Sequence, residues 1–355
     1  MQYGTYLKVP YSFLAREAGV ALLLVIFVIL LASMLVIDLA YSTTLGSQIS
    51  ANLQRSAQAE YILKSAVNLA RVLIKEDKTR EDSERDLWGK FINGMPVPVE
   101  LLGVSEKNVR IELEIRPEDS KMPIGALIQA GFPKPIKKWE DAFLTLFKDP
   151  YFDFDNDKEE DQTGIFPERH FNSTELLGIL IDYMDSDKDS YDPGGIEGES
   201  GFPSGLFPDT PIKRVSELSG IPGFTPARVR KLMPFISAIS SNNGSAISKV
   251  NINLAPSIIL KSLSPNLDDK AVQAIIDFRK SEDGPFTEQN LKAKLDEIIG
   301  DQNISGNVWT MTTAQSRWFQ VIAKIDYGTS LYFMRAYLLK GSAGELPEIQ
   351  SVELF

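Results

Sequence analysis

The first 75 residues carry two consecutive hydrophobic patterns. The first is an uncharged run of twenty residues from Ala18 to Ile37. In a helix that rises about 1.5 Å per residue, this run spans roughly 30 Å, which matches the hydrocarbon core of a bilayer. It is longer than the apolar core of a secretory signal peptide, which has about 7 to 15 residues. We therefore predict a membrane-spanning helix over residues 20–37.

The second pattern is amphipathic and continues to about Ile74. Its polar residues lie on one side of a helix, and its apolar residues recur at steps of three to five on the other. The apolar set is Ile49, Leu53, Ala57, Ile62, Ala66, Leu69 and Leu73. We expect the helix to leave the membrane and to pack one side on a globular domain.

Strand patterns appear on both sides of a long helical region. Residues 318–325 and 331–339 are rich in aromatic and branched side chains, which predicts an antiparallel hairpin, and residues 109–115 have the same character. The predicted fold class is α+β, with the long helix on a small antiparallel sheet. Residues 38–121 and 311–355 would form the sheet domain, and residues 122–310 a large, mostly helical inserted domain.

The negative charge of the chain is confined to one segment. Residues 151–210 contain sixteen Asp or Glu and three Lys or Arg, a net charge of −13, whereas the whole chain carries −11. The rest of the chain therefore sums to +2. Such a local excess predicts a dedicated acidic element within the inserted domain.

The strongest metal-binding pattern lies at the end of a helical stretch near Met184. Carboxylates at alternate positions, followed by two glycines and a glutamate, can surround one hard cation with oxygen ligands, and calcium is the natural candidate. The spacing is not that of an EF-hand, because Ser190 replaces the turn glycine. A solvated acidic loop is the alternative interpretation. The candidate ligands are Asp185, Asp187, Asp189, Asp192 and Glu197.

A second acidic cluster precedes this one. It contains Asp153, Asp155 and Asp157, a possible second ion site. No glycine-supported turn and late glutamate follow at a suitable distance. The interleaved Phe152 and Phe154 favour a loop that packs against the inserted domain.

Two helical hairpins suggest a rival function. Residues 215–232 have the pattern of a helix, a Pro-Gly hairpin and a second helix, and residues 250–286 repeat it weakly. In helix-hairpin-helix modules, backbone amides contact DNA phosphates, and Arg228, Arg230 and Lys231 could assist here. Two carboxylates in the second hairpin and the neighbouring acidic segment would repel DNA. Nucleic-acid binding is therefore not expected, but a membrane-anchored DNA receptor stays open as an alternative.

The chain offers few catalytic groups. It contains no cysteine, and His170 is its only histidine. Cysteine nucleophiles, disulfides and metal sites built from several histidines are therefore excluded. We predict a structural role for His170 and no enzymatic activity.

The segment Arg16-Glu17-Ala18-Gly19-Val20, followed by the apolar run, resembles the N-terminus of the type IV pilin and pseudopilin class. The resemblance implies that a prepilin peptidase cuts between Gly19 and Val20, so that residues 1–19 are a leader. Most members carry a glutamate five residues after the cut, where this chain has Leu24. A carboxylate inside a membrane costs about 2.5 kcal/mol or more and needs a partner. A subunit with no neighbour above it can dispense with that carboxylate, so Leu24 predicts a place at the tip; a lipid-facing residue is the alternative.

The whole chain resembles the K family of minor pseudopilins of type II secretion. The resemblance implies a SAM-like inserted domain that binds calcium, with Asp185, Asp187 and Glu197 as the favoured ligands. It also implies a single-pass protein of the bacterial inner membrane with its globular part in the periplasm. The implied partners are the I and J pseudopilins, the major pseudopilin, the inner-membrane assembly platform and the prepilin peptidase. A minor pilin of a type IV pilus is a further alternative.

Overall fold

The computed structural model describes residues 11–103, 109–129, 131–203, 205–239, 248–327, 330–342 and 344–355. Residues 1–10 of the predicted leader lie outside this part. The chain divides into two compact units, Met1–Tyr61 and Ile62–Phe355. The first unit contains most of helix α1 (Tyr11–Lys75), which confirms the predicted long helix. From Gly19 onward α1 is long and apolar enough to cross a membrane, with a mean hydropathy of 3.4 over its most apolar 18-residue window.

The last turns of α1 belong to the second unit and pack on the sheet through a face that overlaps the predicted one only in part. Ala66, Val67, Ala70 and Ile74 are buried there, whereas Leu69 and Leu73 of the predicted set are only half-buried. The buried face is rotated by about one residue from the predicted one. Ile49 and Leu53 of the predicted set are exposed in the first unit.

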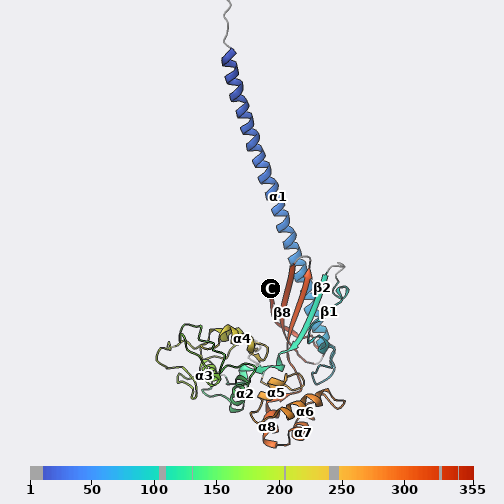
Figure 1. The fold of residues 1–355 in the computed structure, drawn as a ribbon. Coiled ribbons are helices and arrows are strands. Elements are labelled where there is room, and N and C mark those ends of the chain that lie inside the picture. The colour runs from blue at the N-terminus through green and yellow to red at the C-terminus, as the bar shows by residue number, and fades with distance from the viewer. Residues whose placement is uncertain are drawn as a thin grey trace, which may run out of the picture. The chain divides into compact units, whose positions relative to one another are not determined.

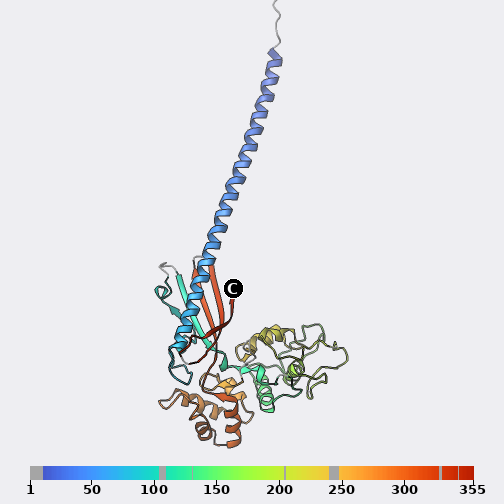
Figure 2. The ribbon, with the colours of Figure 1, turned by 180° about the vertical axis from the view of Figure 1, so that it is seen from behind.

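One antiparallel sheet of five strands carries the helix end, in the order β1-β2-β7-β8-β9. Figure 2 shows the end of α1 lying across one face of this sheet. The strands are β1 (Met95–Val97), β2 (Val109–Pro117), β7 (Trp318–Tyr327), β8 (Ser330–Leu339) and β9 (Glu348–Leu354).

The central strands confirm the predicted hairpin and its neighbour, whereas β1 and β9 were not predicted. Both are edge strands. β1 is only three residues long and contains a proline, and β9 is mostly exposed, so neither shows the alternation that marks a half-buried strand.

The inserted part lies between β2 and β7, and its helices form two groups in Figure 1. The α-helices are α2 (Lys137–Phe147), α3 (Ser173–Met184), α4 (Pro226–Leu232), α5 (Ser257–Ser262), α6 (Asp269–Lys280), α7 (Leu291–Ile299) and α8 (Gln302–Met311). Short parallel pairs join β3 (Met122–Pro123) to β4 (Ile236–Ser237), and β5 (Val250–Asn251) to β6 (Thr312–Thr313). The 3₁₀ helices are η1 (Trp88–Phe91), η2 (Val99–Leu102), η3 (Glu118–Ser120), η4 (Ile124–Ala126) and η5 (Val215–Gly220).

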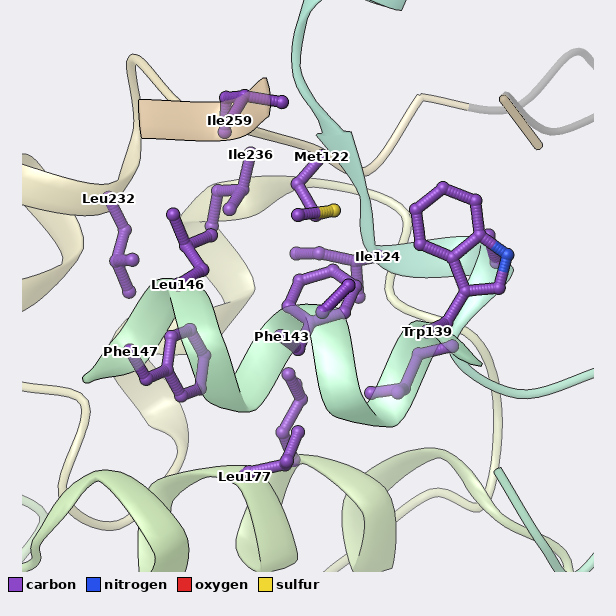
Figure 3. Close-up of a cluster of buried hydrophobic side chains, with 14 of the residues drawn as sticks. Met122, Ile124, Trp139, Phe143, Leu146, Phe147, Leu177, Leu232, Ile236 and Ile259 are labelled. Carbon is purple, nitrogen blue, oxygen red and sulfur yellow. The ribbon is translucent and has the colours of Figure 1, made fainter. Parts of the chain in front are cut away.

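A continuous hydrophobic core runs through the inserted part, from Met122 to Met311. Helix α2 contributes Trp139, Phe143 and Phe147, which point to neighbouring elements on several sides (Figure 3). Phe147 meets Phe224 edge to face, with ring centroids 6.1 Å apart. The two groups of helices therefore share one core.

Buried carboxylates stabilise the crossing, which is the place where the chain leaves the sheet for the inserted part and returns to it. Because Pro117 on β2 pairs with Phe319 on β7, the inserted part leaves and re-enters the sheet at adjacent positions. Asp119 closes this crossing by accepting the backbone N–H groups of Arg317 at 3.1 Å and Trp318 at 2.8 Å. Burial raises the pKa of Asp119 to about 7, against the effect of these two donors.

Asp82 makes a second connection at the same place. Its Oδ2 accepts the N–H of Ser316 at 2.8 Å, and its Oδ1 accepts from Lys340 Nζ at 2.7 Å. Lys340 also lies 3.6 Å from Asp77. Asp82 is 1 % exposed. Lys340 is thus the cation that neutralises a buried carboxylate on the chain segment after α1.

We predict that Lys340→Met destabilises the soluble part, residues 48–355, by about 2–3 kcal/mol, because Asp82 would stay buried without a cation. Urea unfolding measures this difference. Lys324→Met is the matched control, since Lys324 lies 3.6 Å from Glu112 in a pair that is nearly half exposed, and its loss should cost under about 1 kcal/mol. Equal effects of the two substitutions would contradict this role of Lys340.

Candidate metal site in the acidic loop

The acidic loop begins where helix α3 ends and folds back against the same helix. Asn172 caps the start of α3, accepting the N–H groups of Thr174 and Glu175. On the side that faces the loop, α3 carries Gly178, and a Cβ at this position would lie 2.4 Å from the backbone carbon of Gly194. Two glycines therefore allow direct contact between helix and loop backbone.

Asp182, one turn beyond Gly178, fixes the loop. Its Oδ1 accepts the N–H of Tyr191 at 2.7 Å, and its Oδ2 accepts the N–H groups of Ile196 at 2.6 Å and Glu197 at 2.8 Å. Burial raises the pKa of Asp182, although these three donors act in the opposite direction. Our prediction did not include Asp182 as a site residue. The available signal was its position among the apolar residues of α3, since a charge on a buried helix face needs specific partners.

This arrangement buries two of the predicted ligands, Asp185 and Glu197. They are 2 % and 4 % exposed, and within the described part of the chain Asp185 Oδ1 and Glu197 Oε2 have no hydrogen-bond partner. Burial, followed by repulsion from Asp187, Asp182 and Glu197, raises the pKa of Asp185 to about 8. Buried carboxylate oxygens without partners are costly, which marks a place where a cation would be stabilising.

The other predicted ligands of the loop lie nearer the surface. Asp187 is half-buried and accepts the N–H of Asp189 at 3.0 Å. Asp189 and Asp192 are exposed. The structure therefore gathers Asp185, Asp187 and Glu197 around the end of α3 and leaves the other two carboxylates on the outside of the loop.

A further carboxylate, Asp209, was missed by our prediction. Its Oδ1 is also buried without a hydrogen-bond partner among the described residues. It lies twelve positions after Glu197, in a stretch with no acidic pattern of its own, so spacing along the chain gave no signal. The donor set contains oxygen atoms only, which suits a hard cation such as calcium.

One group of three acidic side chains in the described residues brings its ligand atoms within 4.8 Å of one another, and it lies elsewhere. It consists of Asp77, Asp82 and Asp86, next to Lys340. That ammonium pairs with Asp77 and Asp82 and offsets one of the three negative charges. The carboxylates of the acidic loop do not form such a close trio.

The residues of the predicted second site serve three separate partners. Asp153 accepts from the Asn156 side chain at 3.0 Å, and Asp155 accepts the N–H of Ser173 at 2.7 Å. Asp157 pairs with Arg228 at 2.6 and 2.8 Å. Burial acts to raise the pKa of Asp157, but hydrogen bonds from Arg228 outweigh it and the pKa is lowered.

Two of the groups that could contact phosphate, the N–H of Gly223 and the guanidinium of Arg228, are bonded inside the protein, whereas Arg230 and Lys231 are exposed. The N–H of Gly223, in the Pro-Gly hairpin, donates to Asp161 at 3.1 Å. Arg228 is 1 % exposed and also donates to the backbone oxygens of Gly223 and Phe154. His170 lies in the same cluster, with Nδ1 3.0 Å from the backbone oxygen of Glu159. The hairpin and its arginine therefore build the interior of the inserted part.

The predicted processing and tip residues lie on α1. Gly19 and Val20 are exposed, and Leu24 is 61 % exposed in the apolar part of the helix. Cleavage between Gly19 and Val20 stays a prediction.

Comparison with known families bears on the segment that carries the site. Residues 167–241, which include the acidic loop and the Pro-Gly hairpin, match the family described as type II secretion system (T2SS), protein K. The matched segment is about a fifth of the chain. Outside it, the apolar helix α1 fits a single-pass membrane anchor.

The fold agrees with this match. The chain shares its fold with a chain in the crystal structure of the GspK-GspI-GspJ complex from the enterotoxigenic Escherichia coli type II secretion system, with a TM-score of 0.60 and 14% sequence identity. The match covers 86% of this chain and 99% of that chain. Comparison with curated proteins gave no match.

We predict that Gly178→Ala destabilises the soluble part by about 3 kcal/mol, because the added methyl group would overlap the backbone of Gly194. Thermal or urea unfolding measures the effect. The control is Gly306→Ala in α8, where no heavy atom would lie within 4 Å of the new Cβ. That change should stabilise the protein by up to about 1 kcal/mol, because glycine weakens a helix interior. A neutral Gly178→Ala would show that the loop does not need this contact.

Proposed function

We propose that this protein is a minor pseudopilin of type II secretion, and that it occupies the tip of the pseudopilus and starts its assembly together with the I and J pseudopilins. The observation that carries the proposal is the combination of the family match over residues 167–241 with a fold shared over nearly all of a chain from the GspK-GspI-GspJ complex. Leu24 supports it, because a subunit without a neighbour above it needs no carboxylate at that position.

The proposed membrane topology follows from the N-terminal helix. After cleavage between Gly19 and Val20 by the prepilin peptidase, the helix would hold the protein in the bacterial inner membrane, with the globular part in the periplasm. Contacts with the major pseudopilin and the assembly platform would follow through the helix. The inserted part would project from the tip, and its bulk would prevent a further subunit from being added above it.

Within this function we assign calcium a structural role in the acidic loop. Asp185, Asp187 and Glu197 would hold the ion, which would supply the positive charge that the buried oxygens lack. Asp182 positions them by holding the loop backbone. The ion would therefore stabilise the outer surface of the inserted part, where the tip would meet its surroundings.

The assembly is tested by co-purification. Residues 48–355 should form a stable three-part complex with the soluble domains of the I and J pseudopilins, as measured by size-exclusion chromatography with light scattering. A strain that lacks the gene should fail to secrete its substrates. Normal secretion by that strain, or salt-sensitive binding of duplex DNA by the same fragment in place of a complex, would favour the DNA-receptor alternative.

The calcium role is tested by thermal unfolding. Calcium should raise the unfolding temperature of residues 48–355 by several degrees relative to chelator, because it binds only the folded loop. Asp185→Asn should remove this shift. Asp153→Asn, which changes an exposed carboxylate of the other acidic cluster, should keep it. Identical melts of the unmodified fragment in calcium and in chelator would refute the structural ion.

A further inference from the structure

Lys188 lies within the acidic loop and faces two of its carboxylates. Its Nζ is 3.5 Å from Glu197 Oε1, and it donates a hydrogen bond to Asp209 Oδ2. The glutamate and aspartate side chains are 5 % and 25 % exposed, whereas the lysine side chain is 58 % exposed. The solvated ammonium of Lys188 thus contacts two carboxylates, of Glu197 and Asp209, that are largely buried.

The ammonium leaves part of the site unsatisfied. Glu197 and Asp209 each keep one buried oxygen without a hydrogen-bond partner in the described residues, as Asp185 does. One positive charge therefore faces two carboxylates, contributed by the loop after the two glycines and by the segment after Phe207, and the third, Asp185 at the end of α3, is not among its partners. A lysine can neutralise only one of these charges, whereas a divalent cation accepts six to eight oxygen ligands.

We propose that Lys188 is the internal counter-ion of this site, that its ammonium and calcium compete for Glu197 and Asp209, and that Asp209 is a further calcium ligand. The inference rests on the proposed calcium role. In the ion-free chain Lys188 holds the two carboxylates together. Calcium must displace the Lys188 ammonium from these carboxylates, and this displacement lowers the affinity for calcium.

The contrast with Arg228 supports an exchangeable role for Lys188. Arg228 also pairs with a carboxylate, Asp157, but it is 1 % exposed and donates to two backbone oxygens as well. Displacing it would leave those oxygens and a buried charge without partners. Lys188 has no such restraint, because most of its side chain is in water and its flexible stem can move the ammonium into solvent at low cost.

The test measures calcium affinity and stoichiometry by isothermal titration calorimetry on the full chain in detergent micelles. Lys188→Met should bind calcium roughly tenfold more tightly, because the ion no longer displaces an ammonium. It should also lower the unfolding temperature in chelator. Lys188→Arg should keep the weaker affinity. Lys213→Met removes the same charge from an exposed position in a neighbouring segment and should leave the affinity within about twofold.

Asp209→Asn separates competition from a general charge effect. If the lysine and calcium share Asp209, this variant should bind calcium more weakly, and most of the gain from Lys188→Met should disappear in the double variant. If Lys188→Met raises the calcium affinity equally with Asp209 and with Asn at position 209, or does not raise it at all, the inference is wrong. Calcium binding by the unmodified chain would in that case still support the proposed structural ion. A chain that binds no calcium in any variant would overturn both.

Discussion

The architecture depends on the antiparallel pairing of β2 with β7. Pairing in this register places Pro117 opposite Phe319, so a segment of about two hundred residues begins and ends at neighbouring points of one sheet. The inserted part can then be large without breaking the sheet, because only the short distance between two adjacent strands has to be spanned. The segment that leaves the sheet and the segment that returns to it must be fixed to each other. Asp119, on the first segment, does this by accepting hydrogen bonds from the backbone of Arg317 and Trp318 on the second.

The same crossing connects the sheet to the helix. Asp82 follows α1 in sequence and bonds to the returning segment through Ser316 and to the end of β8 through Lys340. Its backbone oxygen accepts from Asn251 of the inserted part at 3.1 Å. Asp82 therefore joins the segment after the helix to the sheet by an ion pair, and to the inserted part and its returning segment by hydrogen bonds. Removing one partner of such a pair is costly because the other charge stays buried.

The sequence predicted the elements whose patterns are local. The apolar run, the strands of the central hairpin and the acidic loop all have a period or composition that can be read within about twenty residues. Residues that act across the fold gave little signal. Asp209 pairs with Lys188, 21 positions away, and Lys340 pairs with Asp82, 258 positions away, so their roles follow from tertiary contacts alone. The edge strands β1 and β9 were not predicted for a different reason. They bury too few side chains to show an alternation of apolar and polar residues.

The helical hairpin shows how one motif can serve two purposes. Its glycine is needed for close packing, because a Cβ at Gly223 would lie 2.9 Å from Leu176 and Phe171, and its N–H donates to Asp161. In a DNA-binding hairpin the same amide would face phosphate. Here an acidic side chain of the protein takes the place that phosphate would occupy, and Arg228 pairs with Asp157 in the interior. The acidity of residues 151–210 is therefore partly structural, because Asp161 and Asp157 satisfy the Gly223 amide and Arg228 from inside the chain.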